Sequence, residues 1–207
     1  MFELIYDCPR FVIVNKTQAA SFHAEQGPGF FVEVESTLGC KLWPVHRLDK
    51  VTTGLVLFAK DSDAAAELGR LFEARQINKC YLALSDKKPG KKQGLIKGDM
   101  TKARRGAWRL LRTQANPAIT RFDSTALGDG RRLYRLWPQT GKTHQLRVAM
   151  KSLGAPILGD DLYGGSAFER VCLHAYALSF EAFGEQVTIT AAPDFITQAP
   201  PPFGEAP

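Results

Sequence analysis

A pair of strand-like segments near the middle of the chain limits its fold more than any other feature. The segments ITRFDST (119–125) and RRLYRLW (131–137) place apolar residues between polar ones, and only the short connector ALGDG separates them. Alternation with a period of two is typical of a strand with one buried face, and a short connector that contains glycine fits a β-hairpin. The sequence therefore predicts antiparallel strand pairing.

Further strand and helix signals place this hairpin in a mixed fold. Short apolar runs with β-branched or aromatic residues predict more strands, at FVIVN (11–15), LVLFAK (55–60), CYLAL (80–84), CLHAYALSF (172–180) and QVTITA (186–191). The segment 61–76 predicts a helix that Asp61 or Ser62 can cap, with one apolar face formed by Ala64, Leu68, Leu71 and Phe72. The segment 143–154 predicts a shorter helix that ends at Gly154. We therefore expect an α+β fold with a largely antiparallel mixed sheet.

The chain has the size and composition of one globular domain. Its 207 residues are 44% hydrophobic and 23% charged, so we expect one catalytic domain over 1–207. Within it we expect an exposed loop at SDKKPGKKQG, a basic insertion at about 86–112 and a proline-rich tail at about 199–207. Without an apolar run of roughly 18–20 residues or a leader-like N-terminus, we expect a cytoplasmic protein with no membrane partner. The cysteine spacing indicates neither a zinc site nor disulfides.

The positive charge of the chain is concentrated in one segment. The formal net charge is +6, but the segment from Lys87 to Arg112 has ten basic residues against the single acid Asp99 and carries +9. Each Lys or Arg that docks on a phosphate releases condensed counterions, so this segment fits a nucleic-acid backbone. A solvated surface loop is the alternative. The candidate phosphate-binding residues are Lys91, Lys92, Lys102, Arg104 and Arg105.

Two polar clusters contain the candidate chemistry. In HRLDKVTTGLVLFAK (46–60), Asp49 precedes a Thr-Thr-Gly turn and is either a reacting carboxylate or a turn-capping residue. In TGKTHQLR (140–147), His144 and Arg147 are spaced to share a helical face, from which Arg147 could be directed at a carboxylate elsewhere. If that carboxylate is Asp49, the pairing would keep it ionised, as a nucleophile or base requires. Spacing alone favours the alternative, a structural ion pair between two loops.

The motif around Asp49 closely resembles the HRLD-x-x-T-S-G-L signature of the RluA-type RNA pseudouridine synthases. Four further blocks match in the family's order: VIVNKT (12–17), INKCYLAL (77–84), TGKTHQLR with PILGDDLYG, and RVCLHAYALSF (170–180). The five blocks cover roughly residues 11–180, and five in order are far more specific than one. The resemblance implies the pseudouridine synthase fold. Since the chain begins close to the first block, we expect no N-terminal S4 domain, and the basic segment would supplement the grip on RNA.

The resemblance implies a role for particular residues. Asp49 takes the place of the aspartate that attacks the target uridine, Tyr81 that of the tyrosine that stacks on the flipped uracil, and Arg147 that of the arginine that pairs with the aspartate. Leu146 would line the base pocket, and Arg47 would enter the RNA stack where the base has left. His46 and His144 are expected to be structural or to contact RNA, because the family's chemistry uses no histidine base.

The chemistry that the resemblance implies needs no cofactor and no metal. Isomerising uridine breaks the bond from nitrogen 1 to the ribose and rejoins the ring through carbon 5, without a redox change or a second reactant. The substrate would be tRNA or rRNA, and no obligate protein partner is implied. The chain departs from the family's pattern at Thr17, Thr53, Lys142 and Ala149. None of these is in the proposed catalytic trio, so the departures bear on substrate identity more than on activity.

Two other functions are compatible with the same residues. One is an RNA-binding or RNA-folding protein on the same scaffold, whose catalysis is lost or secondary. The other is a metal-dependent nuclease or a glycosidase that uses Asp49 with Asp160 and Asp161. On the family resemblance, GDDLYG is instead a structural loop.

Overall fold

The computed structural model describes residues 2–17, 29–197, 200 and 202–204. The chain divides into two compact units. Residues 1–79 and 174–201 form unit 1, and residues 80–173 and 202–207 form unit 2. The proline-rich tail predicted at about 199–207 lies outside the described residues except at 200 and 202–204.

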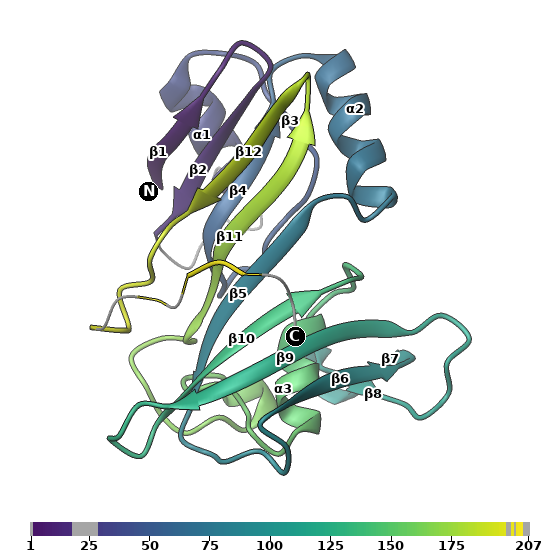
Figure 1. Ribbon diagram of the computed structural model, residues 1–207, viewed down its shortest axis with the longest axis vertical. Coiled ribbons are helices and arrows are strands. Elements are labelled where there is room, and N and C mark those ends of the chain that lie inside the picture. The colour runs from purple at the N-terminus through teal and green to yellow at the C-terminus, as the bar shows by residue number, and fades with distance from the viewer. Residues whose placement is uncertain (1, 18–28, 198–199, 201, 205–207) are drawn as a thin grey trace. The chain divides into compact units, whose positions relative to one another are not determined.

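Unit 1 is built on a mixed sheet. Its strands are β1 (Phe2–Asp7), β2 (Phe11–Lys16), β3 (Trp43–Pro44), β4 (Thr53–Ala59), β11 (Leu173–Ala182) and β12 (Glu185–Thr190). They follow the order β1-β2-β4-β11, with β12 beside β11 and β3 beside β4 (Figure 1). The pairing of β4 with β11 is parallel, whereas β1–β2, β2–β4, β3–β4 and β11–β12 are antiparallel. All residues of β2 and β4 are buried, as expected of strands with neighbours on both edges and covered faces.

The described residues of unit 1 include the helices α1 (Phe30–Leu38) and α2 (Ser62–Glu73). The apolar face of α2 packs on Phe11, Ile13, Leu55 and Leu57 of the sheet. Asp61 caps α2, because its Oδ1 accepts a hydrogen bond of 2.8 Å from the Ala64 N–H. The predicted helix and its cap are confirmed.

Gly54 allows β4 and β11 to approach each other closely. Its φ is 109°, and a Cβ at this position would collide with the backbone of Ala175. Glycine is therefore required here both by its conformation and by the space available. The strand that follows the Asp49 loop depends on this contact.

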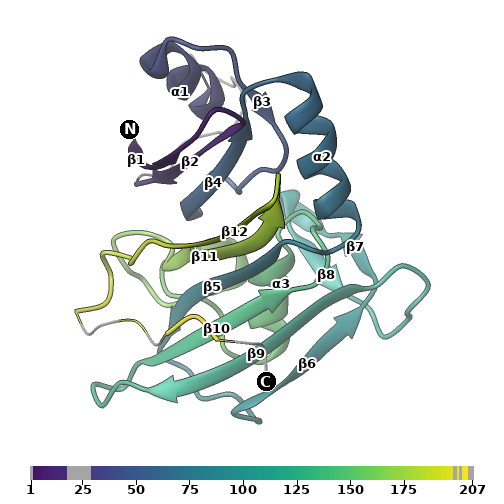
Figure 2. The same cartoon turned by 45° about the horizontal axis from the view of Figure 1, so that its top comes forward.

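The described part of unit 2 contains an antiparallel sheet and the α-helix α3 (Gln145–Ser152). The sheet has the order β5-β10-β9-β6, formed by β5 (Asn78–Ser85), β6 (Gln93–Gly98), β9 (Ala118–Ala126) and β10 (Arg132–Pro138). The predicted β9–β10 hairpin is confirmed, with Leu136 opposite Phe122 on one side and Tyr81 on the other. Helix α3 (Gln145–Ser152) packs against β9 and β10, and Figure 2 shows β10, β9 and β6 side by side in front of it.

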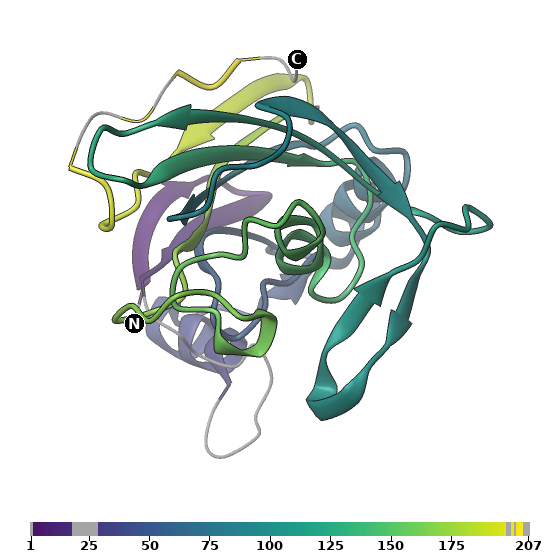
Figure 3. The ribbon, with the colours of Figure 1, turned by 90° about the horizontal axis from the view of Figure 1, so that it is seen from below.

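The basic segment is more ordered than its sequence indicated. The loop expected at SDKKPGKKQG is shorter than predicted, because Ser85 belongs to β5 and Gln93 and Gly94 belong to β6. After β6 the segment forms a two-stranded ribbon of β7 (Met100–Lys102) and β8 (Trp108–Leu110), joined by a 3-10 turn at Arg104–Gly106. Figure 3 shows this teal ribbon projecting away from the sheet of unit 2. The ten basic residues of the segment are all exposed.

The expected α+β class with a largely antiparallel sheet is confirmed. Strands β1, β3, β6, β7 and β8 and helix α1 were not predicted. The sequence of α1, FFVEVESTL, has the β-branched and aromatic residues of a strand, and its N-cap Gly29 has no side chain to mark a helix start. None of the described helices is long and apolar enough to cross a membrane.

Candidate active site

A buried lysine binds the main chain of the loop that contains Asp49. Lys16, at the end of β2, is 1% exposed, and its Nζ donates to the carbonyl oxygens of Asp49 (3.1 Å), Lys50 (2.9 Å) and Thr52 (3.0 Å). The Thr52 N–H also donates to the Asp49 carbonyl, at 3.0 Å, which closes the turn. The turn therefore uses the main chain of Asp49, while the residue itself is half-buried.

The charges of Lys16 and Asp49 act on each other. Burial lowers the pKa of Lys16 to about 8, and the negative charge of Asp49 opposes this shift. Three carbonyl oxygens around one ammonium group favour its charged form. The Lys16 ammonium group therefore both restrains the backbone at Asp49 and places a positive charge next to it.

His46 supports the same loop as a neutral ring. Its Nε2 accepts a hydrogen bond of 2.9 Å from the Leu57 N–H, and its ring lies 4.8 Å from that of Phe72 on α2. Burial, and then the charge of Lys79, lowers the pKa of His46 to about 3. The ring is therefore uncharged near neutral pH, and contact of His46 with substrate stays a prediction. The neighbouring Arg47 is exposed.

The strand that follows the Asp49 loop is fastened by a second histidine. His174 Nε2 lies 2.9 Å from the Ala191 carbonyl oxygen, and its Nδ1 lies 2.8 Å from Thr53 Oγ1. Because a carbonyl only accepts, Nε2 carries the proton and Nδ1 accepts from the Thr53 hydroxyl. His174 is 3% exposed. Its hydrogen bond with Thr53 therefore links the start of β4 to β11 in the interior of unit 1.

Arg147 is buried in unit 2 in a bidentate ion pair with Asp160. Its Nε lies 2.7 Å from Asp160 Oδ2, and its Nη2 lies 2.7 Å from Oδ1. The guanidinium also lies over the ring of Tyr163, 4.8 Å from the ring centre. A carboxylate partner for Arg147 was predicted from the sequence, with Asp49 of unit 1 as the candidate. Asp160 was not predicted as a partner.

The polar residues before Arg147 fix the start of α3. His144 was expected to share a helical face with Arg147, which is wrong, because His144 is the N-cap in a left-handed conformation with φ 57°. Its Nδ1 instead lies 2.8 Å from the Tyr163 hydroxyl. Gln145 joins α3 to β9, since its Nε2 donates to the Ile119 carbonyl and to Thr120 Oγ1, both at 3.0 Å. Leu146 is 7% exposed.

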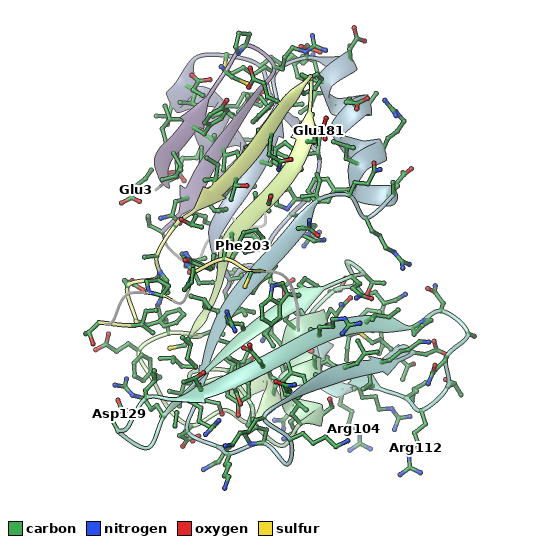
Figure 4. The ribbon with its side chains drawn as sticks, in the orientation of Figure 1. Glu3, Arg104, Arg112, Asp129, Glu181 and Phe203 are labelled. Carbon is green, nitrogen blue, oxygen red and sulfur yellow. The ribbon has the colours of Figure 1, made fainter. Side chains whose placement is uncertain are left out.

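Tyr81 lies on β5 between two buried neighbours, Cys80 and Leu82, and is itself half-buried. Side chains alternate across a strand, so Tyr81 faces the opposite side of β5 from those two residues. The ribbon of β7 and β8 lies in the same unit, and Figure 4 shows Arg104 of its 3-10 turn and Arg112, which follows β8, pointing outward from unit 2. Asp49 thus belongs to unit 1, and Tyr81, Arg147, Leu146, His144 and the basic segment belong to unit 2.

Comparison with known proteins decides the family. Residues 4–152 match the sequence profile of the RNA pseudouridylate synthase family. An uncharacterized RNA pseudouridine synthase of Haemophilus influenzae is 52% identical over 195 residues, which cover 92% of this chain and 87% of that protein. The chain belongs to this family.

Other members agree in sequence and in fold. A ribosomal large subunit pseudouridine synthase C of Rickettsia bellii is 33% identical over 204 residues, covering 91% of this chain and 67% of that protein. The solved structure of human RNA Pseudouridylate Synthase Domain Containing 1 has a TM-score of 0.80 at 24% identity, and covers 95% of this chain and 85% of that one. This RNA pseudouridylate synthase is therefore of the RluA type, and the expected fold is confirmed.

The blocks that carry the family resemblance contact one another within each unit of this pseudouridylate synthase. In unit 1, VIVNKT holds the HRLD loop through Lys16, and LHA holds the strand after it through His174. In unit 2, TGKTHQLR and PILGDDLYG are joined by Arg147 and Asp160. Lys16 had a signal in the sequence, because a lysine that ends a largely apolar run must find polar partners once buried. His174, Asp160 and Tyr163 lie in the family blocks RVCLHAYALSF and PILGDDLYG, but the sequence did not indicate which residues they contact.

Proposed function

We propose that the protein isomerises specific uridines in structured RNA to pseudouridine, with Asp49 as the nucleophile after the base is flipped out. The observation that carries the proposal is the anchored Asp49 loop, in which Lys16 binds three carbonyl oxygens of the main chain. A nucleophile must be held close to its productive position. The hydrogen bonds from Lys16 would hold the backbone of Asp49 in such a position.

The reaction balances without another reactant. The bond from nitrogen 1 to the ribose breaks, the uracil turns, carbon 5 bonds to the ribose, and the carbon 5 proton passes to solvent while nitrogen 1 gains one. A carboxylate can form the covalent intermediate at the ribose or at carbon 6 of the ring, or it can promote elimination to a glycal. All three routes use Asp49 ionised.

The other proposed roles follow from residue type and place. Tyr81 is an aromatic platform for the flipped base, and Arg47, exposed beside the Asp49 loop, fills the gap in the RNA stack. Leu146 lines the pocket, and Arg147 provides the positive charge that orients the reacting carboxylate. His46 and His144 support these groups or contact RNA.

The basic segment is proposed to bind the RNA backbone. All ten of its Lys and Arg side chains are exposed, among them Lys91, Lys92, Lys102, Arg104 and Arg105. A β-ribbon with exposed arginines suits backbone contacts, which position a protein on its target without reading sequence. The proposed setting is the cytoplasm, with tRNA or rRNA as substrate. Since the Rickettsia relatives are named for the large ribosomal subunit, large-subunit rRNA is the first substrate to test.

A second candidate is an RNA-binding protein of the same fold whose catalysis is lost. The exposed basic ribbon favours it, because the ribbon would bind RNA whether or not Asp49 reacts. Hydrolysis with a metal at Asp49, Asp160 and Asp161 is less favoured, since both oxygens of Asp160 accept from Arg147.

Mapping of pseudouridine separates the two candidates. Carbodiimide modification and primer extension would be applied to rRNA and tRNA from cells with the gene, without it, and with an Asp49→Asn copy. We expect at least one site to vanish on deletion and to stay absent with the variant. If deletion removes no site, the enzymatic proposal is wrong.

A further inference from the structure

One side chain, Tyr163, contacts three different parts of unit 2. It ends the short 3-10 turn η2 (Asp161–Tyr163) and is 4% exposed. Its hydroxyl accepts a hydrogen bond of 3.0 Å from the Trp108 N–H and lies 2.8 Å from His144 Nδ1. Its ring carries the Arg147 guanidinium on its face.

The Trp108 contact fastens the basic ribbon. Trp108 is the first residue of β8 and stands opposite Lys102 of β7. The Trp108 N–H donates to the Tyr163 hydroxyl. A separate hydrogen bond of 2.8 Å, from the Ala103 N–H to the Ala107 carbonyl oxygen, closes the 3-10 turn of the ribbon. The Tyr163 hydroxyl therefore attaches to the ribbon close to Arg104 and Arg105.

The Arg147 contact fixes a charged group that the proposed reaction uses. Asp160 binds the guanidinium in its plane by two hydrogen bonds, and Tyr163 covers its face. A cation on an aromatic face is attracted by the ring quadrupole, most strongly where water is excluded. Arg147 and Asp160 are 5% and 1% exposed. Two residues of one loop, Asp160 and Tyr163, thus set the orientation of Arg147.

We propose that Tyr163 is a positioning residue, whose hydroxyl sets the RNA-binding ribbon and whose ring sets Arg147. This inference rests on the proposed function, in which the ribbon binds RNA and Arg147 acts at the reacting carboxylate. The two contacts come from different parts of one rigid side chain. RNA bound to the ribbon would consequently have a fixed position relative to Arg147.

Two substitutions separate the hydroxyl from the ring. Tyr163→Phe keeps the ring over Arg147 but removes the hydrogen-bond contacts of the hydroxyl with Trp108 and His144. Loss of the Trp108 contact alone should raise KM about 3- to 10-fold, the range for removal of one hydrogen bond, and we expect the change in KM to exceed the change in kcat. Tyr163→Leu also removes the ring from Arg147, so kcat should fall further than in Tyr163→Phe. The measurement is tritium released from a transcript that contains 5-tritiated uridine at the mapped site.

A second measurement distinguishes positioning from general loosening. In a protein with Lys102, Arg104 and Arg105 changed to Gln, Tyr163→Phe should have no further effect on KM, because residues that act through one contact are not additive. Amide hydrogen exchange at Trp108 should be faster in Tyr163→Phe than in the wild type.

The outcomes that overturn the proposal differ from those that overturn the function. Tritium release with an unaltered KM in Tyr163→Phe, or an equal KM effect with and without the ribbon charges, would overturn the positioning role alone. Unchanged exchange at Trp108 would do the same. A wild-type protein that releases no tritium would overturn the proposed function and this role with it.

Discussion

Lys16 and Asp49 are separated by 33 positions in the chain, yet one ammonium group sets the course of the backbone around the proposed nucleophile. A buried lysine is costly unless its three donors are satisfied. Here three carbonyl oxygens of the loop accept from it. The same bonds that offset the burial of Lys16 also restrict the loop, so stability and site geometry depend on one residue.

Asp49→Asn tests the chemical role of the carboxylate. The amide is nearly isosteric and leaves the bonds from Lys16 to the main chain in place, so we expect tritium release to fall at least about 10³-fold, as for loss of a nucleophile. RNA affinity should change less than about threefold, because backbone contacts elsewhere supply most of it. Asp63→Asn on the exposed side of α2 is the matched control and should keep full turnover. Wild-type turnover in Asp49→Asn would remove the nucleophile assignment.

His46 should make stability depend on pH. Its pKa is about 3 in the folded protein against an ordinary 6.5, so between these values the unfolded chain binds a proton that the folded one does not. The free energy of unfolding should therefore decrease as the pH falls through this window, by up to about 1.4 kcal/mol per pH unit.

The comparison is His46→Gln, which keeps an acceptor for the Leu57 N–H but does not titrate. Urea unfolding at pH 7 and pH 5 should show a smaller loss of stability in the variant than in the wild type. An identical loss in both proteins would mean that His46 contributes nothing to acid destabilisation.

At the scale of elements, the approach of β4 to β11 depends on Gly54. Gly54→Ala should destabilise the protein by at least about 2 kcal/mol, because a Cβ meets the Ala175 backbone and φ is positive. Gly69→Ala, within α2 and with nothing within 4 Å of the added Cβ, should stabilise it by about 0.5–1 kcal/mol. Urea unfolding measures both, and equal effects would contradict a special requirement for glycine at Gly54.

The basic segment should dominate the salt dependence of RNA binding. The affinity for RNA falls as the salt concentration rises. Changing Lys91, Lys92, Arg104 and Arg105 to Gln should make the slope of log affinity against log salt less negative, by about 0.7–0.9 for each phosphate that is no longer neutralised. The control changes the exposed Lys41, Arg70 and Arg75 of unit 1 to Gln, and should alter the slope little per charge removed. A slope that depends equally on both sets would indicate diffuse attraction rather than a binding surface.

At the scale of the whole molecule, the proposed reaction requires no metal. Protein treated with EDTA and assayed in monovalent salt that keeps the RNA folded should retain its full rate of tritium release. The physical reason is that the isomerisation needs one carboxylate and an oriented base, and Asp160 already binds Arg147. A rate more than about tenfold lower, restored by a divalent cation, would favour the metal-dependent alternative.

The elements with a strong local period were predictable. Helix α2 follows from its apolar face and its cap, and the β9–β10 hairpin follows from two alternating segments around a short connector. Helix α1 and the ribbon strands were not, because α1 has the composition of a strand and β7 and β8 are too short to show a period. The family and the candidate residues followed from ordered motifs, while their roles stay predictions.

The sequence by itself determined helices α2 and α3, the strands with a clear apolar pattern, the family and the residues to consider. Only the tertiary structure decided that Lys16 holds the Asp49 loop, that Asp160 pairs with Arg147, and that Tyr163 joins Arg147 to the ribbon. Periodicity and capping depend on residues a few positions apart, so the sequence shows them directly. The partner of a buried polar group depends on where distant segments meet, which is set by the packing of the whole unit.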